Sequence, residues 1–254
     1  MTDFTIAHIS DLHLVDRGHD VTLNDGHELV DSLEAESPDI IIDTGDHTGS
    51  GLARQFEQAE EVTSRLADIA DYYLTTANHD VSIGGSSTGR YTRGNWESYA
   101  ERVDTSYEAG SQWPRVIDRD GLRLILIDTC AEPTLVARGH IGDEQLRRIG
   151  IAVAEARGRG MRTILAGHHC LSADARGLDR TLYLTDRDAL AETLREAGGV
   201  DLGLFGHLHR KAHWSDVLGF RRLVACPMST RDGGWWHISW DTRGFFGVGW
   251  ASVT

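Results

Sequence analysis

The feature that most constrains the fold of this chain is the alternation of short apolar runs with longer amphipathic segments. Five runs are typical of buried strands: residues 4–10, 39–45, 72–77, 162–167 and 200–206. The segments between them show helical periodicity, as in the spacing of Phe56, Ala59, Val62, Leu66 and Ile69. Strands separated by helices predict βαβ units and a largely parallel sheet.

Other parts of the chain depart from this alternation. Residues 81–113 are rich in glycine and serine, which predicts an irregular insertion carrying one short helix. Residues 114–129 predict a β-hairpin, because Asp120 and Gly121 form a favoured two-residue turn between β-rich runs. Residues 213–254 alternate short β-like runs with glycine turns and are expected to be antiparallel. Together these patterns predict one layered α/β domain that spans the whole chain.

Composition and charge exclude several classes of protein. The formal net charge is −14, whereas a surface that binds nucleic-acid duplexes needs a basic stripe. No run approaches the roughly 20 apolar residues that a membrane span requires, and the N-terminus lacks the pattern of a secretory leader. Three dispersed cysteines without a C-x-x-C pair indicate reduced thiols. We therefore expect a cytoplasmic protein without a nucleic-acid or membrane partner, and the sequence leaves a homo-oligomer open.

Polar residues follow each of the five strand-like runs. They are Asp11 and His13 after the first run, Asp46 after the second, Asn78 after the third, His168 (with His169 beside it) after the fourth, and His207 and His209 after the fifth. In α/β sheets, the carboxyl ends of the strands are where sites are built. The sequence therefore predicts that these side chains share one site.

The residue types in this predicted site favour metal binding. Imidazole and carboxylate ligands suit Mn, Fe or Zn. The D-x-H and H-x-H spacings fit a strand end or the turn after it, because residues i and i+2 point to the same side. Seven ligands are too many for one tetrahedral ion, so two ions are expected, roughly 3.5–4 Å apart. Two cations would also reverse the acidic field locally and admit an anionic substrate.

In order along the chain, the segments DLH (11–13), GD (45–46), ANHD (77–80), GHH (167–169) and GHLH (206–209) resemble the motifs of the calcineurin-like metallophosphoesterase superfamily. The resemblance is to the compact branch that contains class III cyclic-nucleotide phosphodiesterases and glycerophosphodiesterases. It covers about residues 4–210, and the tail, 213–254, is expected to complete the second sheet. Two positions depart from the family pattern: Ala77 replaces a glycine, and Cys170 stands where the family often has proline. The family alignment favours His168 over His169 as the ligand.

This resemblance implies a four-layer αββα sandwich, in which mixed β-sheets are flanked by helices and the metal site lies at the carboxyl ends of the strands. It implies that Asp11, His13 and His209 hold one metal ion, that Asn78, His168 and His207 hold the other, and that Asp46 and a hydroxide bridge both. The hydroxide would attack phosphorus. His79 would stabilise charge on the phosphate and protonate the leaving oxygen, and Asp80 would orient His79.

The identity of the bond that is broken stays open at this level. We expect hydrolysis of a phosphodiester in a small anionic substrate, such as a cyclic nucleotide or a glycerophosphodiester. A phosphomonoesterase or nucleotide pyrophosphatase would use the same site, whereas a non-catalytic protein-binding scaffold should lack ligands that are all present here. Arg90, Arg93 and Trp96 are candidate substrate contacts, because the insertion at 81–113 follows the motif that contains His79; a solvated loop is the alternative interpretation.

Overall fold

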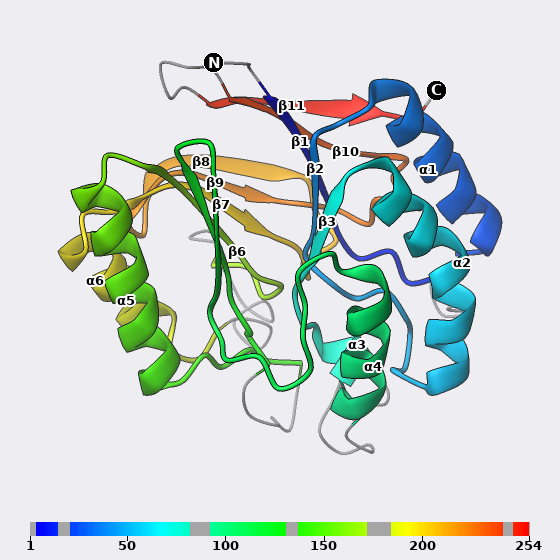
Figure 1. Ribbon diagram of the computed structural model, residues 1–254, viewed down its shortest axis with the longest axis horizontal. Helices are drawn as coiled ribbons and strands as arrows, with labels where there is room; N and C mark the ends of the chain where they lie inside the picture. The colour runs from blue at the N-terminus through cyan, green and yellow to red at the C-terminus, as the bar shows by residue number, and fades with distance from the viewer. Residues whose placement is uncertain are drawn as a thin grey trace.

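The computed structural model describes residues 4–14, 21–81, 92–130, 137–171, 184–240 and 246–253. Two β-sheets lie between two groups of helices, so that the order of layers is αββα (Figure 1). Helices α1 (Leu23–Glu36), α2 (Ala53–Ile69), α3 (Asn78–Val81) and α4 (Arg93–Val103) lie on one side, and α5 (Asp143–Gly158) and α6 (Arg187–Glu196) lie on the other. This is the architecture that the sequence predicts.

The first sheet has the strand order β11-β10-β1-β2-β3. Its strands are β1 (Phe4–Ile9), β2 (Ile40–Asp43), β3 (Asp71–Leu74), β10 (Gly234–Trp240) and β11 (Phe246–Ser252). The pairs β1–β2 and β2–β3 are parallel, so their carboxyl ends lie at one edge.

The second sheet has the order β4-β5-β6-β7-β9-β8. Its strands are β4 (Arg115–Arg119), β5 (Leu122–Leu126), β6 (Arg162–Ala166), β7 (Val200–Phe205), β8 (Ala212–Val217) and β9 (Phe220–Ala225). Strands β5, β6 and β7 are parallel. The predicted hairpin is β4–β5, in which Arg119 pairs with Leu122 across a turn where Asp120 (φ 47°) and Gly121 (φ 83°) both take positive φ, as a type I′ turn requires.

The C-terminal tail differs from its prediction. It does not simply complete the second sheet: β8 and β9 extend that sheet, whereas β10 and β11 join the first sheet beside β1. It is also not wholly antiparallel, because β9 pairs in parallel with β7. In β10, Trp236, Ile238 and Trp240 pack between the sheets. On the other face Trp235 packs toward the helices, beside the partly buried His237 and the exposed Ser239. Pairing with β1 places the apolar face of β10 in the core between the sheets.

The helices close the core on each side of the two sheets. Residues Ile6, Ile40, Leu124 and Leu204 belong to the apolar layer between the sheets. On α2, the predicted apolar face is buried, apart from the partly buried Ile69. None of the helices in the described ranges is long and apolar enough to cross a bilayer.

Candidate metal centre

The structure brings the seven predicted ligands together where the two parallel sets of strands end. Asp11, His13, Asp46 and His209 form one group, and Asp46, His168 and His207 form a second; within each group the candidate ligand atoms all lie within 4.8 Å of one another. Asn78 joins the second group, because its Oδ1 lies 3.0 Å from Nε2 of His168. Asp46 is shared by both groups, so its carboxylate is placed to bridge two ions.

The first group presents two ring nitrogens to one point. Nε2 of His13 lies 3.1 Å from Nε2 of His209. Carboxylate oxygens border the same space, since Asp11 Oδ1 lies 3.2 Å from His209 Nε2 and Asp46 Oδ2 lies 3.7 Å from His13 Nε2. Nitrogen and carboxylate donors that converge in this way fit a transition-metal ion or Zn²⁺.

The second group is oriented by the backbone. Nδ1 of His168 lies 2.8 Å from the carbonyl oxygen of Thr44, which can only accept a hydrogen bond. His168 therefore carries a proton on Nδ1 and turns Nε2 toward Asp46 Oδ2 (3.2 Å) and His207 Nδ1 (3.2 Å). A ligand histidine held through its other nitrogen is the usual arrangement at metal sites.

Six of the seven predicted ligands lie in loops beyond the strands and not on the strands themselves, whereas Asn78 is the first residue of α3. Five of them have left-handed backbone conformations: Asp11 (φ 53°), His13 (φ 44°), Asp46 (φ 59°), His207 (φ 69°) and His209 (φ 48°). Of the two positions that the i, i+2 spacing allows, a strand end or the turn after it, the D-x-H and H-x-H segments therefore occupy the turn. Such conformations are uncommon for residues other than glycine and cluster at functional sites. The folded chain bends sharply here to aim the side chains inward.

Two glycines allow the backbone segments to meet. A Cβ atom on Gly206 would lie 1.9 Å from Ser10 Oγ and 2.5 Å from Asp11 Oδ2. This contact lets the backbone N–H of His207 donate to both oxygens of Asp11, at 3.1 and 3.0 Å. A Cβ atom on Gly45 would lie 2.6 Å from the Cβ of Ala77. Ala77 is not among the described residues with positive φ, so the alanine at this family glycine position needs no strained backbone.

Charges within the site hold its acidic ligands in the ionised form. Burial opposes ionisation of Asp11, but the hydrogen bond from His209 and the charge of His168 lower the pKa of Asp11 to about 2. Burial likewise opposes ionisation of Asp46, and the charges of His168 and His79 hold its pKa well below the ordinary range. Burial favours a neutral His168, yet the charge of Asp46 raises the pKa of His168 to about 9.

His79 lies at the edge of the site and is partly exposed. Its backbone N–H donates to Asp46 Oδ1 at 2.9 Å, and its ring stands edge-on to the ring of His13, with centroids 5.0 Å apart. Nδ1 lies 3.0 Å from the carbonyl oxygen of Gly49, so Nε2 lies on the side of the ring away from that carbonyl. This position suits a group that acts on a bound phosphate.

The prediction that Asp80 orients His79 does not match the contacts of Asp80 in the structure. The Asp80 carboxylate instead accepts hydrogen bonds from the backbone N–H groups of His47 and Thr48. The ring of His79 contacts the Gly49 carbonyl. Both His79 and Asp80 lie in α3, and successive side chains in a helix point about 100° apart, which sends them to different neighbours.

Two residues compete in sequence with the predicted ligands and lie outside both ligand groups. Nδ1 of His169 lies 2.8 Å from Thr129 Oγ1. Asp43 accepts from the backbone N–H of Gly45 at 2.9 Å and from the hydroxyl of Tyr72 at 2.8 Å. The geometry favours His168 and Asp46.

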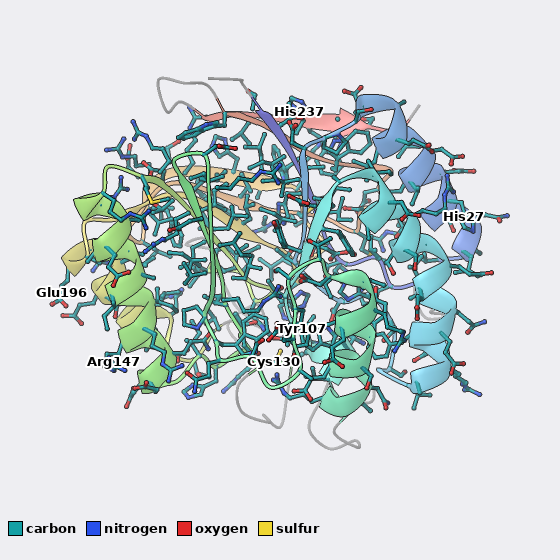
Figure 2. The ribbon with its side chains drawn as sticks, in the orientation of Figure 1. His27, Tyr107, Cys130, Arg147, Glu196 and His237 are labelled. Atoms are coloured by element: carbon teal, nitrogen blue, oxygen red, sulfur yellow. The ribbon has the colours of Figure 1, made fainter. Side chains whose placement is uncertain are left out.

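The candidate substrate residues have three different outcomes. Arg90 lies outside the described residues. Arg93 is 18 % exposed, and its Nη2 lies 2.8 Å from both Asp128 Oδ2 and the carbonyl oxygen of Cys130. Trp96 is fully buried and packs against Tyr107 and Trp113, so its substrate-contact assignment is wrong. Figure 2 shows Cys130 and Tyr107 close to α3 and α4, and both belong to one apolar cluster.

Sequence reasoning misses His47. Without ligand spacing it is expected to be a surface or core residue, and it is a core residue, but the sequence does not indicate that its ring lies between Asp43 and Asp80. Its position directly after the Gly-Asp pair at 45–46 is the only signal in the sequence that could have drawn attention to it.

Comparison with known proteins is consistent with this geometry. The family model described as calcineurin-like phosphoesterase matches residues 4–211. A probable cyclic nucleotide phosphodiesterase of Synechococcus sp. (strain WH7803) is 27% identical over 244 residues, which cover 87% of this chain and 81% of that protein. A dimetal phosphatase from Danio rerio shares the fold with a TM-score of 0.70 at 13% identity, over 99% of both chains. The protein TT1561 of Thermus thermophilus has a TM-score of 0.54 at 14% identity, over 100% of both chains.

Proposed function

The chain belongs to the calcineurin-like phosphoesterase family, and on that premise we propose that it is a dinuclear metallophosphodiesterase that hydrolyses a small anionic substrate, such as a cyclic nucleotide or a glycerophosphodiester. Family membership establishes a metal-dependent phosphoester hydrolase. The observation that carries the finer proposal is the pair of ligand groups joined through the Asp46 carboxylate. The name of the Synechococcus relative supports a diester substrate.

The donor set supports the proposal of two metal ions. Asp11, His13 and His209 would hold one ion, Asn78, His168 and His207 would hold the other, and Asp46 would contact both. When bound, two such cations supply Lewis-acid chemistry: they withdraw charge from a phosphoryl group and make water a competent nucleophile at neutral pH. Manganese, iron and zinc all suit these nitrogen and oxygen donors.

The protein's own residues position the substrate and move a proton. With Nδ1–H of His79 donating to the Gly49 carbonyl, Nε2 is directed away from the loop, and in the doubly protonated ring it can donate to a phosphoryl or leaving-group oxygen. The backbone N–H of His79 donates to Asp46, which holds His79 next to the carboxylate that both ligand groups share. This arrangement favours charge stabilisation close to where the P–O bond breaks.

We also propose Arg93 as a cation on the substrate side. It is tied to Asp128, which accepts a hydrogen bond from Thr76, two residues before the ligand Asn78. A guanidinium held in this way adds positive charge near the ligands in a chain whose net charge is −14.

The test compares bis(p-nitrophenyl) phosphate with p-nitrophenyl phosphate, using protein loaded with Mn²⁺ or Zn²⁺, and then a panel of cyclic nucleotides and glycerophosphodiesters. We expect a higher kcat/KM for the diester. Asp46→Asn serves as the control and should abolish both activities. A monoester preference would instead indicate a phosphatase or nucleotide pyrophosphatase. Absence of activity toward every phosphate ester, with metals shown to be bound, would contradict the proposal.

A cytoplasmic location is part of the proposal. Its support is that Cys130, Cys170 and Cys226 are free, buried thiols, as expected in a reducing compartment. Cell fractionation of the host with an antibody to the protein tests this assignment.

A further inference from the structure

His47 is a fully buried histidine whose ring lies between two carboxylates. Nδ1 lies 2.8 Å from Asp80 Oδ2. On the other side, Nε2 lies 3.3 Å from Asp43 Oδ2, an ion-pair distance whose geometry falls short of a hydrogen bond. The ring of His47 therefore bridges two buried carboxylates.

The carboxylate of Asp80 binds the segment that follows Asp46. Its Oδ2 also accepts from the backbone N–H of His47 at 3.2 Å. Its Oδ1 accepts from the backbone N–H of Thr48 at 3.0 Å and from the Thr48 hydroxyl at 3.3 Å. Asp80 lies in α3, which also carries Asn78 and His79. These bonds join α3 to residues 47–48.

The same loop sets the orientation of His79. The Gly49 carbonyl, one residue beyond Thr48, lies 3.0 Å from Nδ1 of His79. The Thr48 hydroxyl accepts from the backbone N–H of Gly51 at 2.9 Å and so fixes the turn on either side of Gly49. Contacts thus run from the ring of His47 through Asp80 and the loop to the ring of His79.

We infer that His47 is a positioning residue: it locks α3 to the loop at 47–49 so that the Gly49 carbonyl holds His79 with its proton on Nδ1 and its Nε2 toward the substrate. This inference rests on the proposed function for the importance of His79, but the contacts themselves do not depend on it. Asp80 contacts this loop, and the loop contacts His79. Without the ring of His47, Asp80 would lose the contact with Nδ1 that helps to hold α3 against the loop.

A packing role for His47 predicts a different outcome. The ring of Tyr99 stands edge-on to that of His47 with centroids 5.3 Å apart, so some loss of stability is expected from any substitution. Stability alone therefore cannot separate the two roles. The orientation of His79 can, because a residue that only fills space has no influence on the protonated nitrogen of another ring.

The first measurement is the ring ¹⁵N spectrum of His79 in Zn²⁺-loaded protein labelled at its 13 histidines, with the His79 signals assigned from a His79→Gln variant. We expect the Nδ1–H form of His79 in the wild-type protein and a mixture of both neutral forms in His47→Gln. An Nε2–H form in the wild-type protein would overturn the inference, even if no substitution at His47 gave a folded protein. An unchanged His79 spectrum in His47→Gln would also overturn it.

Kinetics form the second measurement. In His47→Gln we expect kcat for aryl phosphodiesters to fall roughly 10- to 100-fold, as for other residues that orient an active group, with KM within about threefold. Metal content should stay that of the wild-type protein. The loss should be larger for poor leaving groups, if His79 assists their departure. Loss of activity that follows loss of metal, with His79 unchanged, would show a structural role and overturn the inference.

Tyr72→Phe is the matched control. It removes the hydroxyl that donates to Asp43 at 2.8 Å, in the same buried network but on the side away from the loop. Its expected effect is lower stability with the His79 spectrum unchanged. If the wild-type protein hydrolyses no phosphate ester, the proposed function fails. The ¹⁵N measurement still tests whether His47 determines, through the loop, which ring nitrogen of His79 carries the proton.

Discussion

Nδ1 of His168 lies 2.8 Å from the carbonyl oxygen of Thr44, and this contact turns Nε2 toward Asn78 and Asp46. His169 is equally buried and lies next to it in the chain, yet its Nδ1 is directed to Thr129. A backbone carbonyl just beyond β2 is thus a partner of His168 and not of His169, although the two histidines are neighbours just beyond β6.

His168→Asn and His169→Asn form a matched pair that tests this difference. We expect His168→Asn to lose metal from the second ligand group and to lower kcat by roughly 100-fold or more, since it removes a direct ligand. His169→Asn should keep its metal, with kcat within about tenfold of the wild-type value, as for a neighbour of a ligand. Metal analysis and steady-state kinetics check both, and equal metal loss in the two variants would contradict the assignment.

Removal of metal should lower the stability of the fold. Two ionised carboxylates, Asp11 and Asp46, are buried side by side, and ions that bind only the folded chain stabilise it. At a free metal concentration 100 times Kd, one ion contributes about 2.7 kcal/mol to the free energy of unfolding. Thermal unfolding before and after chelation, and again after addition of Mn²⁺ or Zn²⁺, measures this effect. A melting temperature that is the same under all three conditions would contradict the binding of a metal ion by the folded protein.

Gly206→Ala should weaken metal binding without altering any ligand. The new Cβ would meet Ser10 Oγ and Asp11 Oδ2 at 1.9 and 2.5 Å, so the contact between the strand ends must open. We expect a loss of about 1–3 kcal/mol in the free energy of unfolding and weaker binding by the first ligand group. Gly94→Ala is the control, because its Cβ would meet nothing within 4 Å. Titration with Zn²⁺ measures the metal affinity of both variants, which should be lower for Gly206→Ala than for Gly94→Ala.

Arg93→Gln should raise KM for an anionic substrate severalfold with a smaller effect on kcat. The substitution removes the cation that we place on the substrate side and leaves the buried carboxylate of Asp128 without this partner. Some loss of stability is therefore expected as well. Arg102→Gln removes an equal charge from the same helix, where it pairs with Glu60 at the surface, and should leave KM unchanged. Equal KM changes in both variants would indicate a general effect of charge.

The ionised carboxylate of Asp118 should contribute its full stabilisation of the fold only above about pH 4. Hydrogen bonds from Arg123 and Arg159 lower its pKa to about 2 in the folded state. Because that value lies below the unfolded one, the contribution is present at neutral pH and is lost as the pH falls through about 4 to 2. The side chain is 34% exposed, so solvent screening limits the effect of Asp118→Asn at pH 7 to about 1 kcal/mol.

Urea unfolding of chelated protein at several values between pH 7 and pH 3 checks the prediction for Asp118. The difference between wild type and Asp118→Asn should shrink toward the acid end. Asp188→Asn, at a carboxylate that is 86% exposed beside Arg187, serves as the control and should change little at any pH. A difference for Asp118→Asn that does not vary with pH would contradict the role of ionisation.

The sequence by itself determined the alternation of strands and helices and the polar residues at the strand ends, because both depend on local pattern. A buried parallel strand requires a continuous apolar run, and the polar residues after it can only lie at its carboxyl end. The turn at Asp120 and Gly121 was readable for the same reason, since its backbone conformation is a property of those two residues.

Only the tertiary structure decided which partners these segments meet. The sequence pattern of β10 does not say that it pairs with β1, and the burial of Trp96 depends on Tyr107 and Trp113. The division of labour between His79 and Asp80 likewise depends on a loop about 30 residues earlier in the chain. Contacts between distant segments arise from the packing of whole elements, and that packing decides which buried polar group satisfies which.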